Sequence, residues 1–180
     1  MRQVIITGIH GGGTSFISEC VSRAGIPMWG RKADSIHFED ADILEANIAC
    51  LEEMNLQWHD SVLVNHNENL YKRLQEYRDS KQGDYGFKEP RITMLLPVYK
   101  KVWPDAKYIC CVRNPLNAAM SRKNAYPSIE VGLKKSINDM AATLKHDIHY
   151  FNYDGNMNEE ERKLSEYIGR KVEIVKYWNK

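Results

Sequence analysis

Glycines close to the N-terminus give this sequence its clearest chemical potential. Four glycines lie within residues 8–13, after the β-branched run of residues 4–6 and before residues 14–23, whose apolar residues recur on one helical face. A strand, a glycine-rich turn and a helix together form a nest of backbone N–H groups that binds phosphate. Glycine suits such a nest because the backbone adopts positive φ and approaches the anion without a Cβ. The alternative is a tight turn that binds nothing.

The spacing of Gly8 and Gly13 is that of the Walker P-loop, but the residues that follow differ. In P-loop kinases and ATPases the second glycine is followed by a lysine that contacts the transferred phosphates. Here Thr14 and Ser15 follow Gly13 directly. The loop therefore predicts phosphate binding and argues against ordinary ATP phosphoryl transfer.

Length and composition predict one domain, residues 1–180, with a substantial core. Of the 180 residues, 43% are hydrophobic and 27% are charged, as in ordinary globular proteins. The net charge of +1 gives no basis for binding to nucleic acid or to a membrane surface, so any anion site must be local. The four cysteines lack metal-site spacing, which predicts buried thiols and a reducing, cytoplasmic setting. No pattern indicates the oligomeric state.

Segments typical of strands and of helices alternate along the chain. Strands are expected at residues 4–6, 26–30, 85–88, 107–112 and 147–153, with residues 172–178 as a further strand or a packed arm. Helices are expected at residues 14–23, 39–56, 70–79, 92–103, 116–123, 129–145 and 159–168. This alternation predicts a three-layer α/β/α fold with a central parallel sheet of about five strands, like that of P-loop NTPases.

Charged and polar residues gather where the predicted strands end. Ligands of open parallel sheets bind beyond the carboxyl ends of the strands. That edge receives the glycine loop and the turn at Asp154. It also receives Lys88, Arg91, Arg113 and Ser121. Because an arginine fork and a hydroxyl suit a second phosphate, these residues predict a ligand with phosphates at both ends.

The motifs, in this order, resemble those of the sulfotransferase superfamily, P-loop-like enzymes that use PAPS (3′-phosphoadenosine 5′-phosphosulfate), and of its small bacterial and phage members in particular. Residues 8–15 resemble the loop G-x-H-R-S-G-T-S, and His37-Phe38-Glu39-Asp40, followed by Asn47, resembles the start of a helix in small members. Residues 87–91 resemble the turn K-D-P-R, and residues 113–122 resemble R-D-P…S-R. Residues 150–169 resemble the late strand and helix of the family.

The resemblance implies transfer of a sulfonate from PAPS to a hydroxyl or amine of a small-molecule or glycan acceptor, with PAP as product and no metal required. It implies that the loop binds the 5′-phosphate through Gly11, Gly12, Gly13, Thr14 and Ser15.

The resemblance also implies roles for side chains outside the loop. Lys88 would lie near the bridging oxygen, with Arg91 also binding the donor, and Arg113 and Ser121 would hold the 3′-phosphate. Glu39 is the expected general base.

Gly11 departs from the family, which has a basic residue there. The neutralising charge is then expected from Lys88, Arg91 and His10. Two alternatives remain: a P-loop-type nucleotide or small-molecule kinase that uses ATP and magnesium, which the missing loop lysine disfavours, and a catalytically inactive nucleotide-binding protein, which Gly11 favours.

Simpler interpretations exist for the individual residues. Glu39 in the first turn of a helix is favoured by the helix dipole alone. Lys88 and Arg91 in a turn are explained as solvated charges, and Arg113 as half of a surface ion pair. Trp58 is expected to pack in the core rather than to contact an acceptor, although an acceptor cleft would have to draw on residues 58–69.

Overall fold

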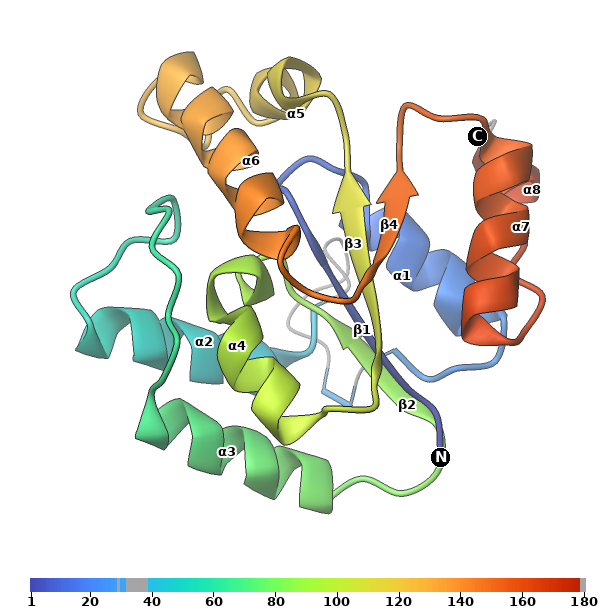
Figure 1. The fold of residues 1–180 in the computed structure, drawn as a ribbon, viewed down its shortest axis with the longest axis horizontal. Helices are drawn as coiled ribbons and strands as arrows, with labels where there is room; N and C mark the ends of the chain where they lie inside the picture. Colours follow the sequence, from blue (N-terminus) through green and yellow to red (C-terminus); the bar gives the residue numbers. More distant parts are fainter. Residues whose placement is uncertain (29, 32–38, 179–180) are drawn as a thin grey trace.

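The computed structural model describes residues 1–28, 30, 31 and 39–178 (Figure 1). The strands are β1 (Gln3–Gly8), β2 (Tyr85–Lys88), β3 (Lys107–Val112) and β4 (His149–Asn152). The helices are α1 (Thr14–Arg23), α2 (Ala41–Glu53), α3 (Glu68–Asp79), α4 (Ile92–Val102), α5 (Pro115–Ser121), α6 (Ile129–Thr143), α7 (Met157–Ile168) and α8 (Val175–Trp178). His37 and Phe38 of the proposed motif, and Trp29 of an expected strand, lie outside the described residues.

All pairings within the sheet are parallel, and the strand order is β2-β1-β3-β4. Ile6 of β1 is in register with Lys88 on one side and with Ile109 on the other. Because the strands are parallel, the loop after β1, the end of β2 and the end of β3 meet at one edge. The predicted α/β fold with a central parallel sheet is confirmed.

The number of strands is four among the described residues, rather than about five. Residues 26–28 form no strand, although the carbonyl oxygen of Pro27 accepts one hydrogen bond from the Gly86 N–H at 2.6 Å. Proline has no N–H to donate to a ladder, which limits this segment to an edge contact. In the C-terminal segment, Val172 and Ile174 are buried, as a packed arm requires, and the short helix α8 follows them.

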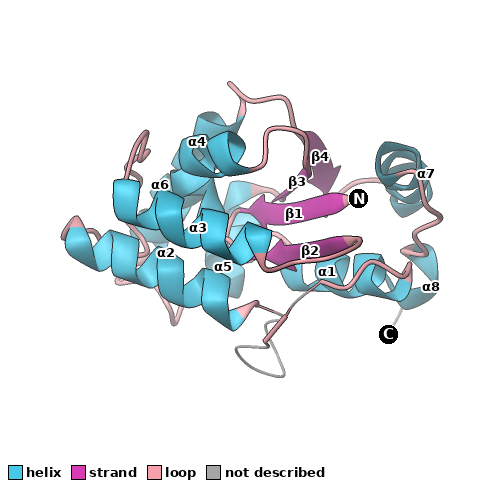
Figure 2. Ribbon diagram, turned by 90° about the horizontal axis from the view of Figure 1, so that it is seen from below, coloured by secondary structure: helices cyan, strands magenta, loops and turns pink. Residues whose placement is uncertain are grey.

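The core consists of two apolar clusters on opposite faces of the sheet (Figure 2). Ile5, Tyr108 and Cys110 face α2, α3 and α4, whereas Ile6 and Cys111 face α1 and α7. Since both faces are covered, the strands are apolar along most of their length rather than alternating with polar residues. This arrangement confirms the three layers. All four cysteines are buried and free of disulfide bonds.

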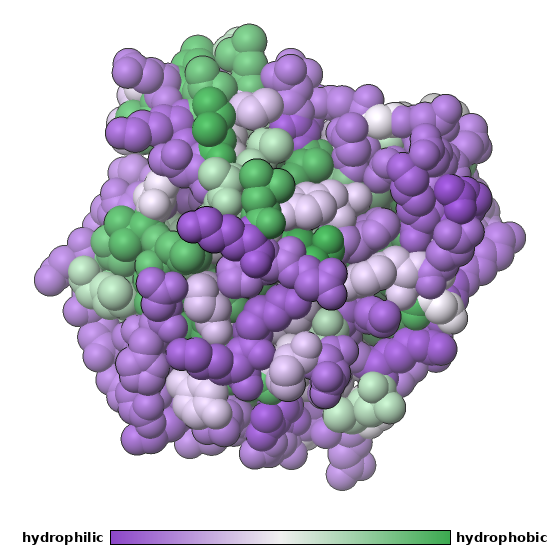
Figure 3. Space-filling view, in the orientation of Figure 1, coloured by the Kyte–Doolittle hydropathy of each residue, from purple (hydrophilic) through white to green (hydrophobic). Residues whose placement is uncertain are grey.

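The outer surface is mainly hydrophilic on the face shown in Figure 3, with apolar side chains gathered over α5 and α6. Leu116 of α5 and Ile137 of α6 each have about half of their surface exposed. Among the described helices, none combines the length and the apolar character that crossing a bilayer requires.

The last residue of β1 brings two backbones into direct contact. Gly8 has φ of +144°, and a Cβ placed on it would lie 2.2 Å from the carbonyl oxygen of Cys111 in β3. The next residue, Ile9, donates its N–H to that same oxygen at 3.2 Å. The strand therefore passes into the loop through a position that only glycine fits.

We predict that Gly8→Ala lowers the free energy of unfolding by about 2–4 kcal/mol, because the methyl group overlaps a backbone atom that cannot move independently. Gly83→Ala is the matched control: φ is +71° and nothing lies within 4 Å of the added Cβ, so only conformational strain of about 1 kcal/mol applies. Urea denaturation measures both. Equal losses would show that the contact with β3 does not constrain Gly8.

Candidate active site

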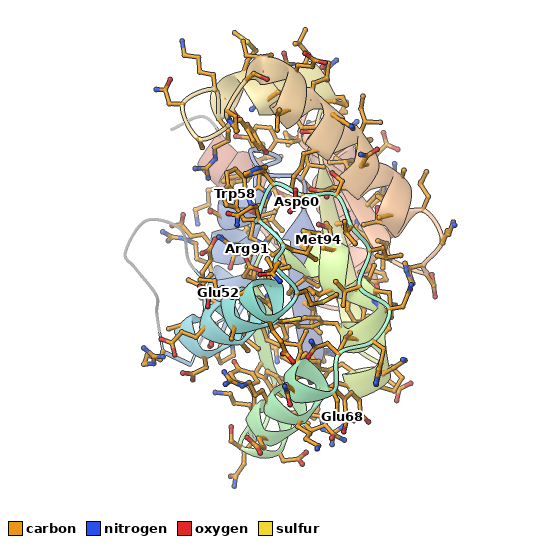
Figure 4. All side chains as sticks on the ribbon, turned by 90° about the vertical axis from the view of Figure 1, so that its left-hand side faces the viewer. Glu52, Trp58, Asp60, Glu68, Arg91 and Met94 are labelled. Atoms are coloured by element: carbon orange, nitrogen blue, oxygen red, sulfur yellow. The ribbon has the colours of Figure 1, made fainter. Side chains whose placement is uncertain are left out.

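A cavity of about 210 Å³ opens at the carboxyl edge of the sheet. It is lined by His10, Gly11, Thr14, Glu39, Trp58, Lys88, Pro90, Arg91, Arg122 and Ala125. Figure 4 shows Trp58, from the loop between α2 and α3, near Arg91, from the turn between β2 and α4. Six residues predicted from the sequence therefore meet in one cavity: His10, Gly11, Thr14, Glu39, Lys88 and Arg91.

The glycine loop has the backbone geometry of an anion nest. Gly11 and Gly13 have φ of +83° and +89°, and Gly13 is the N-cap of α1. Within the described chain, the N–H groups of Gly13 and Thr14 have no hydrogen-bond partner, whereas the Gly12 N–H donates to the Ile9 carbonyl at 2.9 Å. Gly12 thus closes the turn, and its two successors offer donors beside the positive end of the helix dipole.

Lys88 and Glu39 form an ion pair within the cavity wall. Lys88 Nζ lies 3.0 Å from Glu39 Oε1, and the two side chains are 1% and 15% exposed. Burial lowers the pKa of Lys88, while the Glu39 carboxylate opposes that shift. The pair joins the end of β2 to the residue before the N-cap of α2, and it places an amine beside the glycine loop.

Asp40 holds Glu39 in this position. Asp40 is fully buried and caps α2, since its Oδ1 accepts hydrogen bonds from the N–H groups of Asp42 and Ile43 at 3.0 and 3.2 Å. Its Oδ2 accepts from the Gly30 N–H at 2.6 Å and from the Tyr77 hydroxyl at 2.9 Å. With four donors on its carboxylate, Asp40 fixes the entry to α2 and therefore the direction of the Glu39 side chain.

Arg91 is held from behind by a buried carboxylate. Arg91 Nη1 lies 2.5 Å from Oε1 of Glu89, which is 0% exposed. Glu89 Oε2 accepts from Asn47 Nδ2 at 2.7 Å, and Asn47 Oδ1 in turn accepts from the Tyr99 hydroxyl at 2.7 Å. Burial raises the pKa of Glu89, and the Arg91 guanidinium opposes that rise. This network fixes Arg91 at the cavity, and its charge is largely compensated there.

His10 lies against Trp58, with ring centroids 5.0 Å apart, and the Trp58 ring also lies 5.0 Å from that of Tyr126. Burial lowers the pKa of His10 well below its ordinary value, and nearby Lys135, Arg91 and Lys88 lower it further. The imidazole is therefore neutral near pH 7. The positive charge expected from His10 is not available to the site.

Arg113 and Ser121 do not line this cavity. Arg113 Nη1 is 3.5 Å from the Gly11 carbonyl oxygen, and its Nε is 3.3 Å from Asp154 Oδ1. The Ser121 hydroxyl donates to the Ala118 carbonyl at 2.8 Å. The structure therefore brings both residues to Gly11, with Asp154 as the acidic partner of Arg113.

The comparison with protein families decides which family this arrangement represents. A sequence model described as "Sulfotransferase family" matches residues 13–169. The chain belongs to the sulfotransferase family. The matched region begins at Gly13, so the departure at Gly11 lies just outside it, and none of the curated proteins compared with the chain matches it.

Solved structures similar to this sulfotransferase family member show the shared fold. A sugar kinase from Janibacter sp. HTCC2649 has a TM-score of 0.55 at 12% identity and covers 97% of each chain. TT1252 from Thermus thermophilus has a TM-score of 0.54 at 13% identity, over 93% of this chain and 96% of that one. Shikimate kinase from Acinetobacter baumannii has a TM-score of 0.51 at 7% identity, over 94% of each chain. At these identities the likeness establishes the P-loop kinase-like fold alone.

The glycine at position 11 of this family member has a steric cause. A Cβ placed on Gly11 would lie 2.4 Å from Ser121 Oγ and 2.8 Å from the Ala118 carbonyl oxygen. Both atoms belong to α5, which packs directly on the loop. With φ also at +83°, a side chain at this position would displace the helix.

Three site residues were not identified as such by sequence reasoning. Trp58, expected in the core, instead lines the cavity from a loop without periodicity. Glu89 was quoted only as part of a turn motif, yet it anchors Arg91. Arg122 also lines the cavity, although it was quoted only as the last residue of the motif that resembles R-D-P…S-R.

We predict that His10 makes stability depend on pH. Because folding lowers its pKa below 6.5, the unfolded chain binds the proton more readily, and stability falls as the pH drops below that value. The expected loss is about 1.4 kcal/mol for each pH unit until the folded pKa is reached. Urea unfolding at pH 7.0 and 5.5 measures it. His10→Gln lacks the titration, so wild type and variant losing the same stability would contradict the prediction.

Proposed function

We propose that this protein transfers a sulfonate group from PAPS to a hydroxyl or amine of a small-molecule or glycan acceptor. The observation that carries the proposal is the position of Lys88. Its amine comes to the glycine loop from the end of the neighbouring strand, not from the loop itself as in a Walker motif. Membership of the sulfotransferase family supports the same assignment.

The residues present suit a donor with an anionic sulfonate and phosphate. His10 Nδ1 and Arg91 Nε, on two residues of the cavity wall, are buried and have no hydrogen-bond partner among the described residues. Buried polar groups of this kind are ordinarily satisfied by a partner, which here would be the ligand. The cavity of about 210 Å³ is smaller than the roughly 300–1,000 Å³ typical of ligand sites. It therefore suits the reacting groups, with the adenosine 3′-phosphate directed to Arg113 and Ser121.

PAPS supplies a sulfonate attached to a phosphate leaving group. Gly13, Thr14 and Ser15 would bind the 5′-phosphate at the N-terminus of α1. Lys88 would neutralise the charge that develops on the bridging oxygen as the bond from sulfur to that oxygen breaks. Because cationic side chains supply this neutralisation, we propose that no metal is required.

Glu39 is the proposed general base. It is the one carboxylate among the described residues of the cavity wall. It would accept the proton of the acceptor while the acceptor oxygen or nitrogen forms its bond to sulfur. The Lys88 amine, at 3.0 Å, would then face both the proton acceptor and the leaving group. Neutral His10 would donate or accept a hydrogen bond without adding charge.

The acceptor would approach beside Trp58, whose ring offers an apolar surface for stacking a ring of a small molecule or glycan. The buried, unpaired thiols support the proposal of a cytoplasmic location.

We predict that PAP raises the melting temperature more than ATP with magnesium does. A ligand that binds only the folded state adds about 2.7 kcal/mol at a hundredfold excess over its Kd. For a domain of this size that corresponds to about 5–11 °C. Differential scanning fluorimetry measures the shift. Stabilisation by ATP with magnesium and none by PAP would instead support a kinase. If PAP binds, turnover of PAPS with an acceptor panel separates an enzyme from an inactive nucleotide-binding protein.

We predict that Arg113→Ala removes recognition of the 3′-phosphate. Loss of a charge-assisted hydrogen bond of about 1.5–3 kcal/mol weakens PAP binding by roughly 10- to 100-fold. Binding of AMP, which lacks the 3′-phosphate, should change little. Calorimetry with both ligands measures the difference, and Arg162→Ala, an exposed arginine of α7, is the control. Equal losses for PAP and AMP would refute the assignment.

A further inference from the structure

Among the described residues of the cavity wall, each charged side chain but one has a partner of opposite charge. Lys88 is paired with Glu39, and Arg91 is paired with buried Glu89. The remaining cation of the wall is Arg122. Its side chain makes no hydrogen bond or ion pair within the part of the chain that the structure describes. Arg122 is exposed to solvent, and it is the cation of the described cavity wall that no carboxylate holds.

The position of Arg122 follows from the packing of α5 on the loop. Ser121 and Ala118 contact Gly11 so closely that no side chain fits there. The Arg122 N–H donates to the Ala119 carbonyl at 3.2 Å, which ends the helix at the mouth of the cavity. The same contact that removes a side chain from the loop thus places an arginine beside it.

We propose that Arg122 is a catalytic residue that binds the equatorial oxygens of the transferring sulfonate. This inference rests on the proposed function. As the sulfur bond to the 5′-phosphate oxygen breaks and the bond to the acceptor forms, the electron pair leaves with PAP and the acceptor proton passes to Glu39. The sulfonate oxygens stay negatively charged throughout, and an unpaired guanidinium fork is the group that suits them.

Arg122 has a competing role, because it adjoins Ser121 in sequence. It would then act with Arg113 on the 3′-phosphate. The geometry favours the sulfonate: Arg122 lines the same cavity as Lys88 and Glu39, whereas Arg113 and Ser121 do not line it. The two roles differ in which ligand loses affinity, since PAPS carries the sulfonate and PAP does not.

The test compares binding of PAPS and PAP by calorimetry, without acceptor, in the wild type and Arg122→Ala. We expect Arg122→Ala to weaken PAPS binding by about 10- to 100-fold and PAP binding by less than about threefold. Arg122→Lys keeps the charge but loses the fork, so it should recover only part of the loss. Lys123→Ala, an exposed neighbour, is the matched control and should bind both ligands as the wild type does.

Each outcome separates this inference from the proposed function. Selective loss of PAPS affinity supports the assignment. Equal loss of PAPS and PAP, or no loss of either, overturns it and leaves the sulfotransferase proposal standing. A wild type that binds neither PAPS nor PAP refutes the proposed function itself, and the role of Arg122 with it. Circular dichroism of Arg122→Ala verifies that the fold is retained.

Discussion

The structure depends on a loop whose backbone packs directly against other parts of the chain. Gly8 meets the carbonyl oxygen of Cys111 in β3, Gly11 meets α5, and a Cβ on Gly13 would lie 2.0 Å from the ring of Tyr153. Each contact is possible only without a side chain. Together they fix the loop against β3, which Arg113 follows, against α5, which carries Ser121, and against the turn after β4, which carries Asp154. The glycines therefore set the shape of the loop and its distance from these segments.

Buried cations at this site are paired with carboxylates, which keep the cations in place but reduce their net charge. Lys88 has Glu39, Arg91 has Glu89, and Lys135, in α6, has Asp139 at 2.7 Å. Burying such ions is costly, and a matched carboxylate with good geometry offsets much of that desolvation. The pairs hold their cations in fixed places but leave little net charge. The electrostatic attraction of the cavity for an anion then depends on groups without a carboxylate, namely the N-terminus of α1 and Arg122.

Sequence patterns predicted those elements well whose formation depends on residues close together in the chain. The β-branched and apolar runs gave the four strands, and the glycine spacing gave the loop, because both reflect backbone preferences within a few residues. The prediction of a strand at residues 26–28 was wrong, because the conformation of this segment depends on the contact of Pro27 with Gly86, which is distant in the sequence. Trp58 and Glu89 were misjudged for the same reason. A loop tryptophan and a turn carboxylate gain their roles only from His10 and Arg91, which tertiary packing brings to them.

The position of the lysine distinguishes this chain from P-loop kinases. P-loop kinases have a lysine in the loop, whereas this chain has a lysine at the end of β2, in the wall of the same cavity as Gly11 and Thr14. Because the amine comes from the strand, the loop itself does not need a charged side chain. The loop can then approach α5 more closely, which is what Gly11 permits. Because α5 packs so closely on the loop, the residue that follows its last turn lies at the cavity. The glycine at position 11 and the arginine after α5 are therefore both consequences of the contact between the loop and α5. The two features have to be interpreted together.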